Sequence, residues 1–280
     1  MTNRQLSYIV KNQKPLVLGA AETVQAACRA MRELGTGSTL VVDDKGRLCG
    51  IFTGRDAVRL LAKRGASNTT SLAAAMTRNP VVVDPTCFAC DALRAMIEGD
   101  FRHLPVTAEG RICGVVSHRD FKGMEMEELL RRAADPARHS TRHREIREII
   151  ENQKPLMLKG SKTIPEAARS MRRRKCGAAL IVDDQRHLKG IFTGRDAVRV
   201  LAGGKDTTTM HLADAMTKDP FSTTPERQAI EALRIMNDGG FRHLPVVESG
   251  KVVGIVSRGD FTGIEVDRLD EEEHLKECIW

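Results

Sequence analysis

The chain has 280 residues, of which 41% are hydrophobic and 29% charged, and its net charge is +7. These values are typical of a water-soluble globular protein, and the length allows one or two domains with real cores. No apolar run approaches the roughly 20 residues that a membrane span needs, and the first residues show no secretory signal, so we expect a cytoplasmic protein with no membrane partner.

The seven cysteines are scattered along the chain in an odd number, which favours reduced thiols over a disulfide framework. Cys87 and Cys90 form a C-x-x-C pair. A redox or metal site would need a second pair or nearby histidines, so this pair is better explained as two thiols on the first turn of a helix. The sequence shows no nucleophile–base pair and no phosphate loop, and we predict neither a catalytic nor a metal site.

The chain repeats itself at an offset of 140 residues, which is half its length. GIFTGRDAVR stands at 50–59 and again at 190–199. Two further segments repeat at the same offset: FRHLPV at 101–106 and 241–246, and NQKPL at 12–16 and 152–156. Each half also repeats internally, because Gly50 aligns with Gly114 in a Gly-apolar-apolar-(Thr/Ser)-x-x-Asp segment. Such self-similarity indicates four copies of one structural unit.

The patterns within each unit predict a β-α-β-β-α order. In the second unit these elements are, in chain order, a strand at 81–83, a helix over 89–97, strands at 103–106 and 112–116, and a helix from Ser117. Three strands with two helices on one face cannot close a core alone, so we expect two units to pack face to face. The predicted fold class is α/β (α+β).

The repeats and the charge pattern together predict the domain boundaries. They give a first repeat at 1–63, a second at 72–130, a charged linker at 131–145, a third repeat at 146–203, a fourth at 212–270 and an acidic C-terminal tail at 271–280. Each half is expected to begin with a short helix, marked by Leu6, Ile9 and Val10 in the first half.

These segments resemble the cystathionine-β-synthase (CBS) domain family. The matching elements are Met76-Thr77-x-x-Pro80 and its copy from Met216, the Arg-His-Leu-Pro-Val strands at 102–106 and 242–246, and the closing (Thr/Ser)-x-x-Asp motif. The resemblance implies that the units pair into two Bateman modules, which can stack into a flat pseudo-symmetric disc. It also implies a regulatory protein that binds adenosine-containing ligands, not an enzyme.

The resemblance further implies which residues bind the ligand. The aspartate would accept hydrogen bonds from both ribose hydroxyls, and the hydroxyl at the helix start would hold phosphate or ribose oxygens. The implied ligand-binding residues are Thr53, Asp56, Thr77, Pro80, Val82, Arg102, His103, Ser117, Asp120, Thr193, Asp196, Thr217, Pro220, Arg242, His243, Ser257 and Asp260. The Asp56 and Asp196 sites rank first, because only their partner units carry both the Thr-x-x-Pro and the Arg-His elements.

Structural roles remain alternatives for the same residues. A Thr or Ser three residues before an acid is also a helix cap. Arg102 and Arg242 could be surface arginines paired with carboxylates, and His103 and His243 could be partly buried, hydrogen-bonded histidines.

The favoured function is that of a non-catalytic sensor that binds AMP, ADP, ATP or S-adenosylmethionine between paired repeats and passes its state to a protein partner of unknown identity. The alternative is a structural or protein-interaction module with degenerate sites. Nucleic-acid binding is disfavoured because aromatic residues make up only 4% of the chain. No obligatory cofactor is expected, and the assembly would be a monomeric disc or a homodimer.

Overall fold

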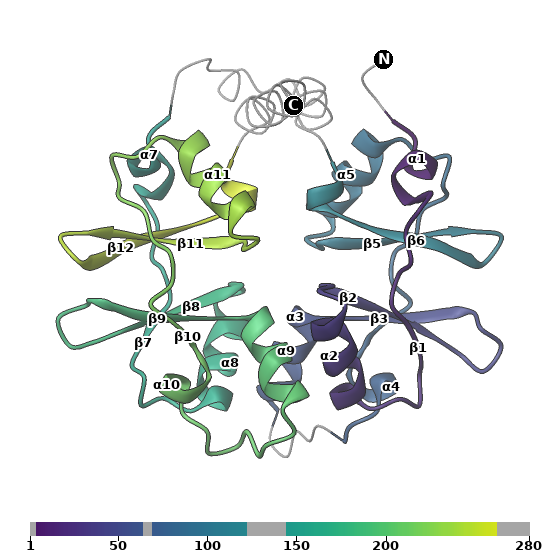
Figure 1. Ribbon diagram of the computed structural model, residues 1–280, viewed down its shortest axis with the longest axis horizontal. Helices are drawn as coiled ribbons and strands as arrows, with labels where there is room; N and C mark the ends of the chain where they lie inside the picture. Colours follow the sequence, from purple (N-terminus) through teal and green to yellow (C-terminus); the bar gives the residue numbers. More distant parts are fainter. Residues whose placement is uncertain (1–3, 64–68, 122–143, 262–280) are drawn as a thin grey trace.

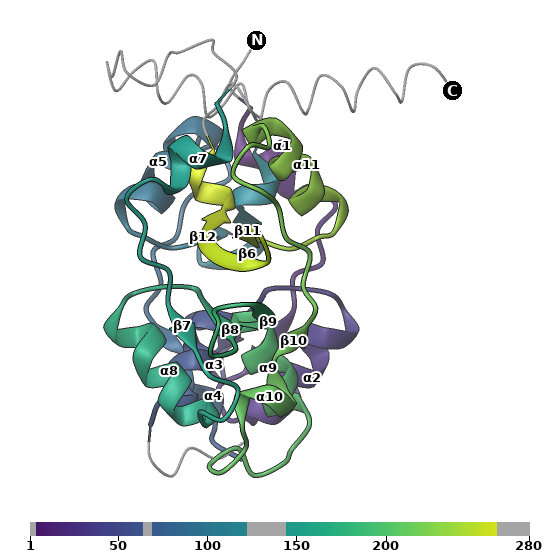
Figure 2. The same ribbon diagram turned by 90° about the vertical axis from the view of Figure 1, so that its left-hand side faces the viewer.

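The computed structural model describes residues 4–63, 69–121 and 144–261. Its two halves lie side by side, and each half stacks its two units one above the other (Figure 1). The molecule is flattened, as its narrower side view shows (Figure 2). The acidic tail predicted at 271–280, and all but the last two residues of the linker predicted at 131–145, lie outside the described residues.

The first half forms two small sheets with helices on their outer faces. Its elements are α1 (Leu6–Val10), β1 (Val17–Gly19), α2 (Val24–Glu33), β2 (Ser38–Val42), β3 (Leu48–Thr53), α3 (Gly54–Leu61), α4 (Leu72–Ala75), β4 (Thr77–Arg78), α5 (Ala89–Glu98), β5 (His103–Ala108), β6 (Arg111–Ser117) and the 3-10 helix η1 (His118–Asp120). The strand orders are β1-β2-β3-β4 and β5-β6.

The second half repeats this arrangement. Its elements are α7 (Ile146–Ile150), β7 (Met157–Leu158), α8 (Ile164–Arg173), β8 (Ala178–Val182), β9 (Leu188–Thr193), α9 (Gly194–Ala202), α10 (Leu212–Ala215), β10 (Thr217–Lys218), α11 (Ala229–Asp238), β11 (His243–Glu248), β12 (Lys251–Ser257) and the 3-10 helix η3 (Arg258–Asp260). The predicted mixed α/β class with four β-α-β-β-α units is confirmed.

The two units of a half exchange their first segments. The lead helix α1 packs on the second unit, where the backbone N of Leu6 donates to the carbonyl of Cys87 (2.9 Å). In return, β4 leaves the second unit and pairs with β3 of the first, with Thr77 opposite Ile51. The segment that precedes the first sheet in the chain thus packs on the second unit, and the segment that precedes the second sheet joins the first unit.

The strand predicted at 81–83 is reduced to one bridge. Val83 pairs with Val106, whereas Val81 and Val82 are exposed and belong to no strand. Pro80 precedes this run and Pro85 follows it, and proline cannot donate to a ladder, so the β-branched pattern has little room to extend.

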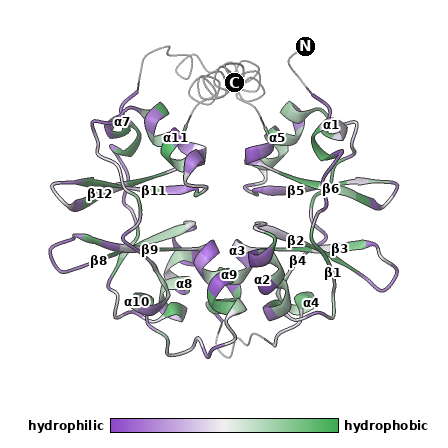
Figure 3. Cartoon of the chain, in the orientation of Figure 1, coloured by the Kyte–Doolittle hydropathy of each residue, from purple (hydrophilic) through white to green (hydrophobic). Residues whose placement is uncertain are grey.

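The two halves share one apolar core. Helix α2 begins at the cap Thr23, whose hydroxyl accepts a hydrogen bond from the backbone N of Ala26, and buries one stripe: Val24, Ala27, Cys28 and Met31. Helix α8 buries the matching stripe in the second half. Both stripes join α3 and α9 in a single cluster at the junction of the first and third units, whereas the second and fourth units have separate cores. Figure 3 shows these helices with apolar and polar residues alternating along them.

Candidate ligand-binding site

Two of the four motif aspartates lie in the first turns of α3 and α9. Asp56 Oδ2 accepts hydrogen bonds from the backbone N (2.9 Å) and the hydroxyl (2.8 Å) of Thr53, in a reciprocal capping box. Thr193 and Asp196 repeat this arrangement, with both distances 2.8 Å. The helix-capping interpretation of these motifs therefore holds in the structure.

The other carboxylate oxygen of Asp56 is also occupied. Oδ1 accepts a hydrogen bond from the hydroxyl of Thr77 (2.8 Å) and pairs with Arg59 (2.7 Å), and Asp56 is only 3% exposed. The second half holds its buried aspartate with the same three residue types: Asp196, Thr217 and Arg199. A ribose can use Oδ1 only if the threonine and the arginine release it.

The remaining two motif aspartates are more open. Asp120 Oδ2 accepts hydrogen bonds from the backbone N (2.6 Å) and the hydroxyl (2.9 Å) of Ser117. Asp260 Oδ2 accepts one from the backbone N of Ser257 (2.5 Å). Within the part of the chain that the structure describes, no group donates to Oδ1 of either aspartate, and both side chains are partly exposed. Among the described residues, each of these two carboxylates therefore has one oxygen without a donor.

Arginines and histidines from all four units meet where the halves face each other. A Cβ placed on Gly177 would lie 3.3 Å from the guanidinium of Arg102 and 2.8 Å from Nε2 of His243, so a first-half arginine reaches a second-half histidine. We call this set the central cationic cluster, and it consists of Arg55, Arg102, His103, His118, Arg119, Arg195, Arg242, His243 and Arg258.

Burial and mutual repulsion shift the titration of this cluster. Burial, and then Arg102 among several arginines, lower the pKa of Arg242 to about 10. Burial, and then neighbouring arginines, lower the pKa of His103 and of His243 to about 3 and that of His118 to about 4. The histidines are therefore neutral at pH 7, and the positive charge of the cluster resides on its arginines.

Within the described ranges, few carboxylates act on this charge. Burial and Arg55 lower the pKa of Arg102, while Asp100 and Asp260 act in the opposite direction. The charge of Asp120 likewise raises the pKa of Arg119, against the effect of burial. The arginines of the cluster outnumber these three carboxylates, so the junction has the electrostatic character of an anion site.

The structure adds five residues to those predicted, all within the (Thr/Ser)-x-x-Asp motifs. They are Arg55, His118, Arg119, Arg195 and Arg258. Arg119 reaches across the junction and donates to the carbonyl of Gly240 (2.5 Å), which also accepts from Arg195 (2.8 Å). The sequence pattern that could have identified them is the basic residue at one or both x positions of every (Thr/Ser)-x-x-Asp motif.

The predicted adenine-contacting segment runs along the side of each half. Thr77 starts β4, and Pro80 and Val82 follow it, with Val82 45% exposed. Thr217 and Pro220 repeat this in the second half, where Phe221 stacks on Phe241 with 5.8 Å between ring centroids. The structure thus holds the Arg-His pairs and the open aspartates at the junction, whereas Asp56 and Asp196 lie buried beside Thr77 and Thr217.

Other site chemistries find no counterpart in the described ranges. Residues 4–63, 69–121 and 144–261 contain no group of three or more His, Cys, Asp or Glu side chains placed to hold a metal ion. The six cysteines among them are free, and burial raises the pKa of the Cys87 thiol. No helix in this part of the chain is both long and apolar enough to span a membrane.

Comparison with known proteins gives a family match along most of the chain. The model of the CBS domain matches residues 9–63, 72–124, 146–203 and 212–266. The CBS domain-containing protein CBSCBSPB5 of Arabidopsis thaliana is 30% identical over 274 residues, which cover 87% of this chain and 50% of that protein. The meiotically up-regulated gene 70 protein of Schizosaccharomyces pombe is 28% identical over 84% of this chain and 40% of its own length.

The chain spans about half the length, or less, of these curated relatives. Among solved structures, protein MJ1225 of Methanocaldococcus jannaschii superposes with a TM-score of 0.72 at 18% identity, over 95% of this chain and 99% of that chain. The similarity of the two structures extends to all four units and establishes the fold.

Proposed function

Because this chain belongs to the CBS-domain family, we propose that it is a regulatory protein that binds an adenine nucleotide at the junction of its halves. The central cationic cluster is the observation that carries the proposal. Arg102 and Arg242 are half-buried side by side, and among the described residues the carboxylates that act on Arg102 are only Asp100 and Asp260. A phosphate group supplies the missing negative charge and accepts several hydrogen bonds from guanidinium groups.

The charge of the cluster also selects among adenosyl ligands. S-adenosylmethionine carries a positive sulfonium, which the arginines would repel, whereas AMP, ADP and ATP carry two or more negative charges near neutral pH. The ligand proposed is therefore a nucleotide with at least one phosphate, and the affinity should rise with the number of phosphates until the junction is filled.

The geometry supports a different order of sites from the one that the sequence suggested. Asp120 and Asp260 each keep one oxygen for a ribose hydroxyl, and Asp260 lies close enough to Arg102 to affect its titration. Asp56 and Asp196 become ribose acceptors only after their threonine and arginine partners withdraw. We therefore assign the ribose first to Asp120 and Asp260.

The protein is proposed to act without catalysis, by passing its ligand state to a protein partner, as a monomeric disc or as a homodimer. The alternative is an interaction module whose nucleotide sites are degenerate. Both carboxylate oxygens of Asp56 and of Asp196 already accept hydrogen bonds from the chain itself, which favours that alternative for these two sites.

The proposal is tested by calorimetry with ADP, adenosine and S-adenosylmethionine on the full chain. ADP should bind more tightly than the other two. Arg102→Ala and Arg242→Ala should each weaken ADP binding by about tenfold, because a charge-assisted hydrogen bond contributes ~1.5–3 kcal/mol, and should change adenosine binding much less. Arg32→Ala, an exposed arginine on α2, is the control.

Two outcomes would count against the proposal. Equal losses for ADP and adenosine would remove phosphate recognition from the cluster. No binding of any of the three ligands to the native chain would leave the interaction module as the better account.

A further inference from the structure

The two halves differ at the outer ends of their hairpins, far from the motif aspartates. In the second half the β8–β9 hairpin contacts the β11–β12 hairpin: the backbone N of Val252 donates to the carbonyl of Arg186 (3.0 Å), and His187 forms a bridge with Lys251. No such bridge joins the corresponding described residues of the first half. There, a pocket of about 500 Å³ opens between the two hairpins.

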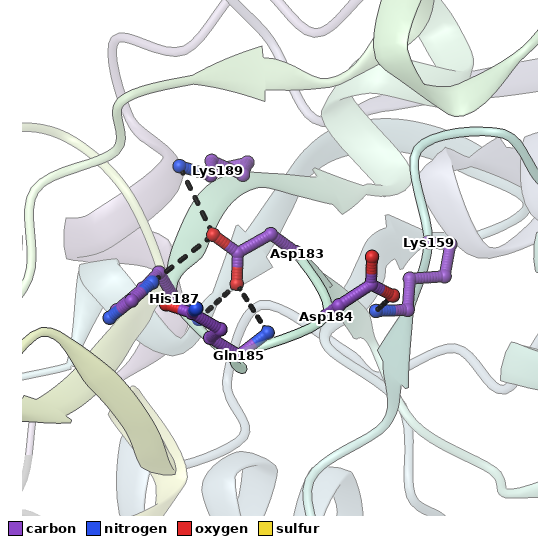
Figure 4. Close-up of polar contacts among 6 residues, drawn as sticks. All are labelled: Lys159, Asp183, Asp184, Gln185, His187 and Lys189. Carbon is purple, nitrogen blue, oxygen red and sulfur yellow. Dashed lines mark hydrogen bonds and ion pairs between the residues drawn. The ribbon is translucent and has the colours of Figure 1, made fainter.

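One cause lies in the residue that follows the hairpin turn. Figure 4 shows the turn of the second half, where Asp183 accepts hydrogen bonds from the backbone N of Gln185 (3.0 Å) and of His187 (2.8 Å). The His187 ring lies 3.1 Å from Asp183 Oδ2 and approaches Gly250, where an added Cβ would come 3.3 Å from the ring. Lys189 pairs with the same carboxylate (3.3 Å). The imidazole thus occupies the space between the hairpins.

The first half builds the same turn without filling that space. Asp43 accepts hydrogen bonds from the backbone N of Lys45 (3.0 Å) and of Arg47 (2.9 Å). Arg47 stands where the second half has His187, and its guanidinium is fixed on Asp43 by contacts of 2.9 and 2.8 Å. Arg47 thus lines the pocket without closing it, whereas His187 approaches the opposite hairpin at Gly250.

A second cause is the residue at the tip of the turn. Gly46 and Arg186 occupy the same left-handed conformation, with φ of 73° and 69°. The Arg186 side chain lies over β7, 3.9 Å from the sulfur of Met157. Gly46 has no side chain to place over β1, and Val17 is consequently 38% exposed.

The pocket has an apolar part, which we call its floor, and a charged part, its mouth, where cations outnumber carboxylates. Val17, Val42 and Ile112 provide the floor, although the second half buries the counterpart of Ile112 almost completely. Lys45, Arg111 and the carboxylate Glu109 line the mouth, and neither of the two cations forms an ion pair within the described residues, so its cations outnumber its single carboxylate. The pocket has the size typical of small-molecule sites.

We propose that this pocket of the first half binds a small amphipathic acid, with an apolar or aromatic body on the floor and a carboxylate at Lys45 and Arg111. The second half shows which chemistry suits the space, because it fills the equivalent position with an imidazole ring and a buried valine of its own. The floor supplies the apolar contact area, and the two cations supply the preference for an acid.

The test uses the full chain with octanoate in calorimetry, and with the apolar sulfonate 8-anilinonaphthalene-1-sulfonate as a fluorescent competitor. Gly46→Arg introduces the residue of the second half and should weaken octanoate binding by about tenfold or more. Gly46→Ala imposes the same left-handed backbone on a non-glycine residue without a long side chain, and should bind as the native chain does. Lys45→Gln, again the second-half residue, should weaken octanoate more than octanol.

Two results would overturn the proposal: octanoate bound equally by native chain and Gly46→Arg, or not bound by the native chain at all. The pocket lies at the Arg111 end of β6, whereas Asp120 follows its Ser117 end. Saturation with ADP should therefore leave octanoate binding unchanged, and the outcome is independent of the proposed nucleotide function.

Discussion

Gly54 and Gly194, the first residues of α3 and α9, lie backbone against backbone where the two halves meet. A Cβ on Gly54 would come 3.0 Å from the carbonyl carbon of Gly194, and a Cβ on Gly194 would meet Gly54 at the same distance. The neighbour in each case is main chain, which cannot rotate away as a side chain could. The close approach of the halves at this point therefore depends on two residues without side chains.

Gly54→Ala should destabilise the protein by about 1–3 kcal/mol, because the added methyl forces the helix starts apart and loosens the shared core. Urea denaturation measures the effect. Gly19→Ala is the matched control, since nothing lies within 4 Å of a Cβ at that position. If the two variants unfold at the same urea concentration, the contact does not limit the packing of the halves.

Asp196→Asn should lower the stability of the unliganded protein by ~1–3 kcal/mol, because the ion pair with Arg199 is lost, while the amide oxygen of asparagine can still accept from the backbone N of the N-cap Thr193. Asp260→Asn should cost clearly less, since the described hydrogen bonds of its carboxylate come only from Ser257. Thermal unfolding of both variants checks the difference. A larger loss of stability in Asp260→Asn than in Asp196→Asn would contradict the conclusion that the chain itself occupies both oxygens of Asp196.

The three cluster histidines should make the protein sensitive to mild acid. The pKa values of His103 and His243 fall to about 3 and that of His118 to about 4, below the usual 6.5, so below pH 6.5 the unfolded chain takes up protons that the folded chain refuses. Stability should be constant above that pH and decline towards pH 4, by up to ~1.4 kcal/mol per pH unit for each histidine. Urea midpoints between pH 7 and 5 measure this.

The double variant His103→Gln/His243→Gln should flatten that pH profile. An unchanged slope would mean that other groups are responsible for the acid sensitivity.

Thr39→Val should stabilise the protein. The Thr39 hydroxyl is fully buried without a hydrogen-bond partner, at a position where the second half has Ala179. Replacing it with an isosteric methyl removes a desolvated polar group worth about 1 kcal/mol or more. Thr36→Val is the control, because the Thr36 hydroxyl donates to the carbonyl of Ser38 (3.3 Å), and that variant should gain nothing. Equal unfolding midpoints for Thr39→Val and the native chain would contradict this.

The sequence predicted the order of elements in each unit because hydrophobic periodicity and turn residues are local signals. It did not show that α1 packs on the second unit or that β4 joins the first sheet, since these exchanges depend on which of two similar surfaces lies nearer in space. The run 81–83 was predicted as a strand from its β-branched residues, and the structure keeps only the Val83 bridge.

The candidate site was predictable in its residue types but not in its partners. The repeated motif located all four aspartates, yet the occupation of Asp56 Oδ1 by Thr77 and Arg59 depends on how β4 folds back onto the first unit. The convergence of Arg102 and His243 from different halves is likewise a tertiary effect, because the residues are far apart in the chain and no local pattern connects them.

The junction of the two halves resembles the interface of a two-fold dimer, but both of its sides belong to one polypeptide. In a homodimer every substitution changes both sides of the interface at once, and a useful change on one side must be tolerated on the other. Here each side can change independently of the other. Arg119 donates across the junction to the carbonyl of Gly240, whereas its counterpart in the last unit is Gly259, which has no side chain to form the equivalent hydrogen bond. Covalent fusion thus permits a division of labour between halves that perfect symmetry would forbid.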